Sequence, residues 1–281
     1  MRFGVIGCGY VGMDAALRLK SANHHVIGTT RSKAKLLELR EVLHGAHLLD
    51  ITDPNLDLSF SDSLDGLLIS VAPCMEGDEY SNVFARGIRN LSHALHQRHR
   101  QRPLHITYIS SAGLYGDQKG KDVTEDSAVD TQSPLNALLG AAEDLILNVS
   151  NNNLKICVLR LGGIYGPGRD MVSMIRQAAG QRVPKDGNAV TAWSGIIDIT
   201  RGIQFAYENG LEGIYNLVDD MQLSRRELST MICDLDGLPP VLWNHTPSPT
   251  ERNVNARVSN AKLKNKGFQL ISPSMLIPAA A

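Results

Sequence analysis

The sequence has few cysteines and none of the spacings that cysteine-dependent sites use. Its 281 residues include only four cysteines, which stand far apart at Cys8, Cys74, Cys157 and Cys233. No C-x-x-C pair occurs, which argues against a disulfide framework and against a thiolate metal site. Scattered cysteines in apolar or glycine-rich runs are typical of a reducing compartment, so we expect a cytoplasmic protein.

Charge of one sign and long apolar runs are lacking as well. The formal net charge is −1, which gives no electrostatic case for nucleic-acid binding. No stretch approaches the roughly 18 consecutive apolar residues of a membrane helix, so we expect no membrane span. His93 and His96 have helical spacing but no third ligand at a suitable distance, so no metal site is expected. The 43% hydrophobic content is nevertheless sufficient for a large buried core.

The N-terminus has the order of a strand, a glycine-rich turn and a helix. An apolar run over 2–6 precedes a G-x-G-x-x-G arrangement, and a helical stretch follows over 13–20. Glycines suit such a turn because it needs unusual dihedral angles, close approach of a pyrophosphate and tight helix–strand packing. A tight turn without a ligand is the alternative, and the context favours a dinucleotide site. The expected cofactor contacts in this loop are Gly7, Gly9, Tyr10, Val11 and Gly12.

The second predicted strand ends without the acidic residue that would hold a ribose 2′-hydroxyl about 20 residues past the glycines. The residues at this point are Thr29, Thr30, Arg31, Ser32, Lys33 and Lys35. Hydroxyl groups and cations suit a 2′-phosphate, which predicts NADP in preference to NAD, with Thr30, Arg31 and Ser32 as contacts. The alternative is that the three cations are a solvated start to the next helix.

Apolar runs and helical stretches alternate along the rest of the chain. Further strands are predicted near 47–51, 66–73, 105–111 and 154–161, and helices over 81–97 and 133–150. This alternation predicts an α/β fold of the Rossmann type, with a doubly wound parallel sheet. Ligands bind beyond the carboxyl ends of such strands, so the loops that follow the strands are candidates for the site.

Five motifs, at residues 7–12, 109–116, 159–169, 213–218 and 257–263, carry a resemblance to one superfamily. The chain resembles the extended or atypical short-chain dehydrogenases/reductases, the group of NAD(P)-dependent epimerases and dehydratases. The resemblance covers most of the chain. It implies an NAD(P)-binding domain over 1–161, to which 196–218 return, and a small C-terminal substrate-side lobe over 162–281.

The resemblance also implies site residues. The implied cofactor contacts beyond the glycine loop are Asp50 and Ile51 at the adenine, Ala72 and Pro73 along the cofactor, and Gly166 and Pro167 at the nicotinamide end. Ser111 matches the family's serine that hydrogen-bonds the substrate oxygen. Tyr115 is the second catalytic candidate, with packing at a turn and a hydroxyl in water as the alternative. Other side chains that can project into the same cleft are Asp78, Tyr80 and Tyr165.

The segment 133–143 departs from the family pattern. Members that transfer hydride generally use a Tyr as acid/base and a Lys four residues later that lowers the Tyr pKa. Alignment of Glu143 on the family's helix places Leu135 and Leu139 at those two positions. Leucine can neither move a proton nor hold a charge, so the usual mechanism is unavailable. In the family this departure occurs together with a tightly spaced glycine loop, in an atypical branch.

Two functions therefore remain open. The first is an oxidoreductase, epimerase or dehydratase that uses NADP on a small molecule, with Ser111 polarising the substrate and a non-standard acid/base. The second is a non-catalytic NAD(P)-binding redox sensor or regulatory protein. A nucleotide sugar as substrate rests on family analogy alone. Related folds pair through the helices expected here over 81–97 and 133–150, which implies a homodimer.

Overall fold

The computed structural model describes residues 1–73, 80–97, 102–244 and 254–276. Within them the chain divides into two compact units. The first unit contains residues 1–110, 137–159 and 199–215, and the second contains 111–136, 160–198 and 216–281. The sequence placed residues 111–136 in the cofactor-binding domain, whereas they group with the second unit. One reason is that strand β6 (Asp117–Val123) in this segment pairs with the late strand β13 (Asn255–Val258).

The first unit is built on a seven-stranded sheet in the order β11-β7-β5-β4-β1-β2-β3. Its strands are β1 (Arg2–Ile6), β2 (His25–Thr30), β3 (Gly45–Leu48), β4 (Gly66–Ile69), β5 (Leu104–Ser111), β7 (Leu154–Leu161) and β11 (Gly213–Leu217). The pairings from β3 through β5 are parallel. All four residues of β4 are buried, as expected for a strand covered on both faces.

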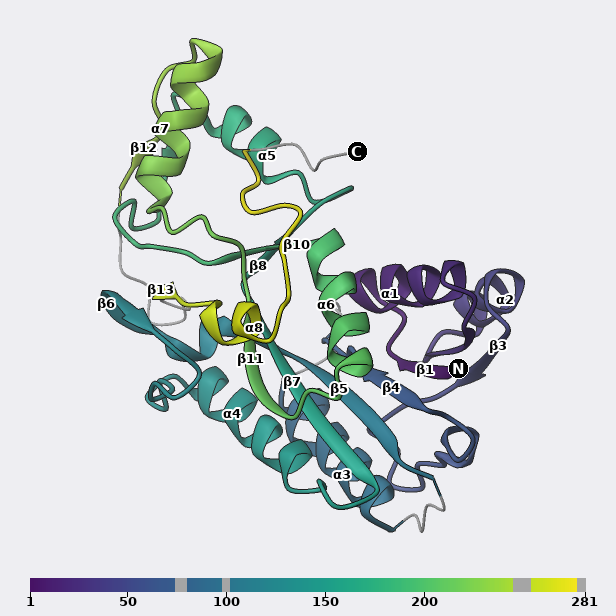
Figure 1. Ribbon diagram of the computed structural model, residues 1–281. Helices are drawn as coiled ribbons and strands as arrows, with labels where there is room; N and C mark the ends of the chain where they lie inside the picture. Colours follow the sequence, from purple (N-terminus) through teal and green to yellow (C-terminus); the bar gives the residue numbers. More distant parts are fainter. Residues whose placement is uncertain (74–79, 98–101, 245–253, 277–281) are drawn as a thin grey trace. The chain divides into compact units, whose positions relative to one another are not determined.

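Helices cover both faces of this sheet. They are α1 (Tyr10–Ser21), α2 (Lys33–Val42), α3 (Ile88–Gln97), α4 (Pro134–Leu147) and α6 (Ile196–Glu208). Figure 1 shows α1 and α6 on one side of the strands and α3 and α4 on the other. The chain winds outward from β1 to β3, returns to β4 beside β1, and winds outward again, so the predicted doubly wound fold is confirmed.

The switch in winding direction lies between β1 and β4. The chain continues from these two parallel strands toward opposite edges of the sheet. This leaves a crevice beyond their carboxyl ends, where ligands of this fold bind. Ile6 pairs with Ile69 at those ends. The glycine loop follows β1 directly, so the sheet places it at this crevice. A feature that the sequence did not predict is the π-helical turn Asn82–Gly87, which leads into α3.

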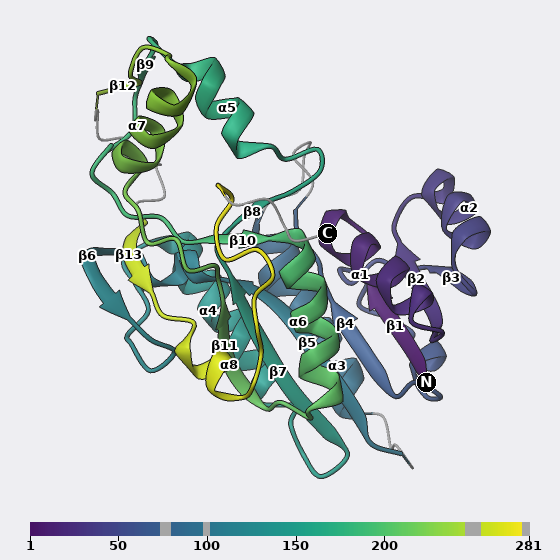
Figure 2. The same cartoon turned by 45° about the horizontal axis from the view of Figure 1, so that its top comes forward.

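In its described residues, the second unit consists of short paired strands and three helices. Its elements are the 3₁₀ turn Ala112–Tyr115, β6 (Asp117–Val123), β8 (Gly163–Tyr165), α5 (Met171–Ala178), β9 (Arg182–Val183), β10 (Trp193–Gly195), α7 (Arg225–Asp236), β12 (Leu242–Trp243), β13 (Asn255–Val258) and α8 (Ala261–Asn265). The helices α5 and α7 lie side by side (Figure 1 and Figure 2). An ion pair between Arg176 and Asp236 joins them, at 2.6 Å.

Candidate functional site

The three glycines of the loop after β1 have different surroundings. Gly7 has a φ of 90°, and a Cβ there would lie 2.4 Å from the Ser70 carbonyl oxygen. A Cβ on Gly12 would lie 2.1 Å from the Gly7 carbonyl oxygen. A Cβ on Gly9 would have no atom within 4 Å. Gly7 and Gly12 are therefore required by packing, whereas Gly9 keeps a space open in front of the backbone.

The start of α1 beside this space suits an anion. Gly9 is the N-cap of α1, no side chain caps the helix, and no acidic residue stands in its first turn. The amide groups of the first turn and the positive end of the helix dipole therefore favour a negative group. Val11 and Gly12 are buried, so their contribution to a cofactor would come from the backbone. The loop thus fits the pyrophosphate of a dinucleotide.

Thr29 connects the glycine loop to the end of β2. Its hydroxyl accepts a hydrogen bond from the Gly7 amide at 3.2 Å, and its carbonyl accepts one from Cys8 at 3.1 Å. The side chain is buried. The buried Thr29 hydroxyl therefore holds the loop in place, and its role as a phosphate contact stays a prediction.

The following residues lead from the half-buried end of β2 at Thr30 to the exposed start of α2. Thr30 accepts a hydrogen bond from the Ser32 amide at 3.1 Å, and the Ser32 hydroxyl caps the helix by accepting from Lys35 at 3.3 Å. Both hydroxyls act here as acceptors, so each keeps a proton to donate. Arg31 and Lys33 are exposed. Cations in the first turn of a helix oppose its dipole, and a bound anion would relieve this repulsion.

The residues implied to lie along the adenine and the cofactor follow β3 and β4 in the first unit. The Asp50 carboxylate is exposed and accepts hydrogen bonds from the amide and hydroxyl of Thr52, at 2.9 and 2.7 Å. The Ile51 side chain is buried, and a Cβ on Gly87 would lie 2.6 Å from its Cδ1. Ala72 is exposed and Pro73 is half-buried beyond β4.

Two neighbouring serines at the end of β5 have different partners. Ser110 donates a hydrogen bond to Glu143 Oε1 on α4 at 2.5 Å, and this glutamate is buried. Ser111 accepts from the Gly113 amide at 3.2 Å, which caps the 3₁₀ turn. Because this bond uses only an acceptor position of Ser111, its hydroxyl proton can still be donated. Ser110 is thus engaged with the fold, and Ser111 is the serine suited to a substrate oxygen.

Tyr115 lies in the core of the second unit, with 0% of its surface exposed. Its hydroxyl donates to Asn216 Oδ1 at 2.8 Å and accepts from Arg160 at 3.0 Å. The Arg160 guanidinium also lies 5.1 Å from the ring centroid. Burial raises the pKa of this phenol, and the guanidinium opposes the rise. The hydroxyl is buried and bonded on both sides, which favours a structural role, and the catalytic role of Tyr115 stays a prediction.

The helix α4 presents leucines one turn apart. Leu135 is half-buried and Leu139 is buried. Residues four apart lie on one helix face, so these two share a face with Glu143, which is engaged by Ser110. Leu135 and Leu139 offer this face no proton donor, and the Glu143 carboxyl is engaged in the fold.

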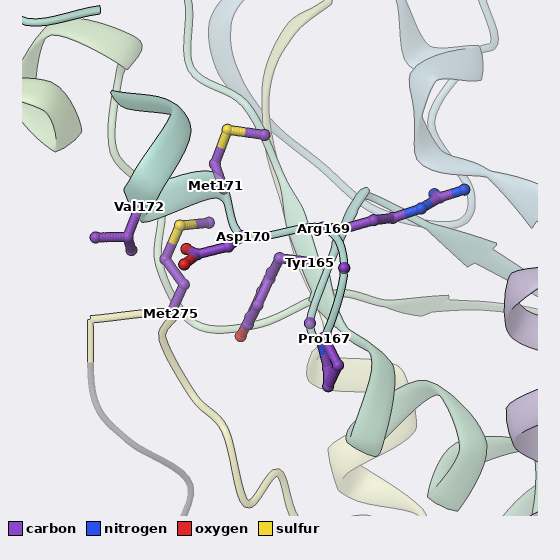
Figure 3. A pocket seen from close by; sticks show the side chains of 9 residues that line it. Tyr165, Pro167, Arg169, Asp170, Met171, Val172 and Met275 are labelled. Atoms are coloured by element: carbon purple, nitrogen blue, oxygen red, sulfur yellow. The ribbon is translucent and has the colours of Figure 1, made fainter. Parts of the chain in front are cut away.

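A pocket of about 350 Å³ lies in the second unit, at the turn before α5 (Figure 3). Gly166 and Arg169 close the turn by mutual backbone hydrogen bonds at 3.2 and 2.8 Å. The lining residues are Tyr165, Gly166, Pro167, Gly168, Arg169, Asp170, Met171, Val172 and Met275. Gly166 and Pro167, which the sequence assigned to the nicotinamide end, thus line a cavity of a size suited to a small ligand.

A buried carboxyl stands near this pocket that the sequence did not single out. Asp219 is 1% exposed, and its Oδ1 accepts from the Met221 amide at 3.1 Å. Its Oδ2 is buried and makes no hydrogen bond of good geometry within the described residues. Burial raises the Asp219 pKa to about 8, partly opposed by the Met221 amide and Tyr165. The only signal in the sequence is an acidic pair directly after the strand 213–218.

The raised pKa of Asp219 predicts a pH-dependent stability. From the ordinary aspartate pKa, about 3.9, to about 8, the folded state keeps a proton that the unfolded state has released. The free energy of unfolding contributed by this group therefore falls as pH rises across that window. We expect the Tm of Asp219→Asn minus that of the wild type to increase from pH 5 to 8 and then level off, as measured by thermal melting. A difference independent of pH would contradict the shifted pKa.

Two other candidates from the sequence are Asp78 and Tyr80. Asp78 falls outside the described residues, and Tyr80 is exposed and stacks on Phe84 with ring centroids 6.0 Å apart. Among the described residues, no group of three or more potential ligands could hold a metal ion. In the same part of the chain, no helix has the length and apolarity needed to cross a membrane.

Comparison with protein families matches residues 5–217 to the NAD dependent epimerase/dehydratase family. The chain belongs to this family. Its members use NAD(P), in agreement with the glycine loop and the uncapped start of α1. No curated protein matches the chain.

Solved structures show the same fold. A functionally unknown conserved protein from Silicibacter pomeroyi is 25% identical over 98% of this chain and 95% of its own, with a TM-score of 0.72. UDP-glucose 4-epimerase of Thermus thermophilus, in complex with NAD, is 21% identical over 96% and 94%, with a TM-score of 0.75. The human epimerase family protein SDR39U1 (isoform 2), with NADPH, is 16% identical over 98% and 96%, with a TM-score of 0.77.

Proposed function

We propose that this protein is an NADP-dependent oxidoreductase, epimerase or dehydratase of an atypical branch that lacks the Tyr and Lys pair. The observation that carries the cofactor assignment is the open space at Gly9 in front of an uncapped helix. The preference for NADP is supported by the start of α2, where Arg31 and Lys33 are exposed and hydroxyls of Thr30 and Ser32 can donate. Its cytoplasmic location and its homodimer stay predictions.

The substrate is a small molecule with a hydroxyl or carbonyl group. The bound cofactor would supply or accept a hydride. Ser111 would donate its hydroxyl proton as a hydrogen bond to the substrate oxygen, while Gly113 holds the serine in place. A nucleotide sugar is the class favoured by the family, since UDP-glucose 4-epimerase and a protein solved with UDP-glucose and NAD share the fold.

A non-catalytic NADP sensor is the second candidate. It is favoured by Leu135 and Leu139, which leave α4 without a proton donor at the positions where the family carries its catalytic pair. The enzyme is favoured by Ser111 and by a pocket large enough for a ligand. The two candidates share the cofactor and differ in turnover.

The cofactor preference is tested by titration of NADPH and NADH, followed by nucleotide fluorescence. Removal of one charged contact to a phosphate costs about 1.5–3 kcal/mol, or roughly 10- to 100-fold in affinity. We expect Arg31→Ala and Lys33→Ala each to weaken NADPH by this amount and to leave NADH unchanged. Lys121→Ala, on exposed β6, is the matched control for loss of a surface cation.

Ser111→Ala separates binding from chemistry in the same assay. It should bind NADPH like the wild type and lose turnover. Equal weakening of NADPH and NADH in the Arg31 and Lys33 variants would refute the 2′-phosphate contact, and no binding of either nucleotide would refute the cofactor site.

A further inference from the structure

The pocket of the second unit contains one side chain suited to exchange a proton. Of its titratable lining residues, Arg169 stays protonated at all relevant pH values. Asp170 caps α5 by accepting from the Ser173 amide and hydroxyl at 3.0 and 2.6 Å, and these bonds lower its pKa. Its carboxylate is thus a poor acid. Tyr165 remains, and its ring stands at the centre of the pocket view (Figure 3).

The Tyr165 hydroxyl is held between three groups. It donates to the Ser272 carbonyl at 3.2 Å, a long hydrogen bond. It lies against Gly195, where a Cβ would come within 3.1 Å of the oxygen. It also faces the Asp219 carboxyl, which contributes, after burial, to the raised pKa of Tyr165. A phenol with a raised pKa does not ionise alone, so a second group must take its proton.

Asp219 is the group that can take it. Asp198 also faces this region, but its two oxygens accept from the amides of Ile271 and Ser272 at 3.0 and 2.8 Å. Asp220 is exposed and bonds to Lys264 at 2.5 Å. Of these three carboxyls, Asp219 alone has a buried oxygen, Oδ2, that accepts no hydrogen bond of good geometry from the described residues. That oxygen can receive a proton from Tyr165.

We propose that Tyr165 and Asp219 form the acid/base pair of this enzyme, with Tyr165 in contact with the substrate oxygen and Asp219 as its proton store. This inference rests on the proposed function. In alcohol oxidation, a bound oxidised NADP would accept the hydride that leaves carbon with its electron pair. The hydroxyl proton passes to Tyr165 Oη as the phenolic proton turns from Ser272 and moves to Asp219 Oδ2. The products are the carbonyl compound, reduced NADP and neutral Asp219.

The location of the pair has a physical rationale. Asp219 faces the like charges of Asp198 and Asp220, the latter offset by Lys264, and it is buried. Its pKa of about 8 lies near neutral pH, where a general acid or base is most effective. In this proposal, two side chains from β8 and from the loop after β11 take the place of the family's Tyr and Lys, which lie on one helix.

The test compares wild type, Tyr165→Phe and Asp219→Asn with NADP and UDP-glucose or dTDP-glucose, and with NADPH and simple ketones. We expect at least about 100-fold loss of turnover in both variants, with NADPH affinity retained in both and Tm retained in Tyr165→Phe. In the wild type, the rate of ketone reduction should decline as pH rises through about 8, and the rate of alcohol oxidation should increase. Both changes of rate with pH should be absent in Asp219→Asn. Tyr207→Phe and Asp234→Asn, which alter a tyrosine and an exposed acid outside the pocket, should keep turnover within about twofold.

Carboxyl ¹³C NMR titration gives a readout that does not need a substrate. One aspartate should titrate well above the others, disappear in Asp219→Asn and change its midpoint in Tyr165→Phe. Turnover unaffected by Tyr165→Phe, or an ordinary Asp219 titration, would overturn the pair and leave the enzyme intact. NADPH binding without turnover of any probe by the wild type would overturn the proposed enzyme, and the pair with it.

Discussion

Gly12→Ala is expected to destabilise the protein by about 3 kcal/mol or more and to abolish NADPH binding. The added methyl group would lie 2.1 Å from the Gly7 carbonyl oxygen and 3.2 Å from Val5 Cγ1. Backbone cannot yield as a flexible side chain does, so α1 must move away from β1. Its buried face, which includes Ala15, Ala16 and Leu19, then loses contacts. In a chain of this size, thermal melting should show a decrease of roughly 6–12 °C.

Gly9→Ala is the matched control, because the same methyl group there meets no atom within 4 Å. The backbone at Gly9 has a negative φ of −78°, so alanine there needs no left-handed conformation. We expect a Tm within a few degrees of the wild type and NADPH affinity reduced about 100-fold, because the methyl group occupies the space kept for the pyrophosphate. Unchanged NADPH affinity in a folded Gly9→Ala would show that the dinucleotide does not approach this loop.

The parts of the fold that depend on local sequence could be predicted. The apolar runs 2–6 and 154–161 coincide with β1 and β7, since a strand buried on both faces reads as a continuous apolar segment. The glycine loop is equally local. The π-helical turn Asn82–Gly87 was not predicted, because the packing of Gly87 against Ile51 involves residues distant in sequence.

The candidate site could be predicted where it follows a strand and could not where it depends on distant partners. The burial of Tyr115 comes from Arg160, 45 residues later, and from Asn216, 101 residues later. No spacing in the sequence predicts these contacts. Asp219 was missed for the same reason: an acidic pair after a strand usually lies in solvent, and here only one member does. Burial of a polar group is a property of the tertiary fold.

Arg160→Ala is expected to destabilise the second unit by about 3–5 kcal/mol, because it breaks a buried charged network. Arg160 is 4% exposed, and its guanidinium both donates to the Tyr115 hydroxyl and covers the ring. The expected decrease in Tm is roughly 10 °C. Arg160→Lys keeps the charge but not the planar donor group, so it should restore only part of the loss.

A double-mutant cycle with Tyr115→Phe tests whether this network is structural. Tyr115→Phe alone should cost about 1–3 kcal/mol, since Asn216 Oδ1 loses its donor inside the core. Because both substitutions remove the same hydrogen bond, the double variant should be more stable than the sum of the single losses predicts, by about 0.5–3 kcal/mol. Tyr115→Phe with an unchanged Tm and abolished turnover would instead make Tyr115 catalytic. Its buried hydroxyl, already bonded to Arg160 and Asn216, favours the structural outcome.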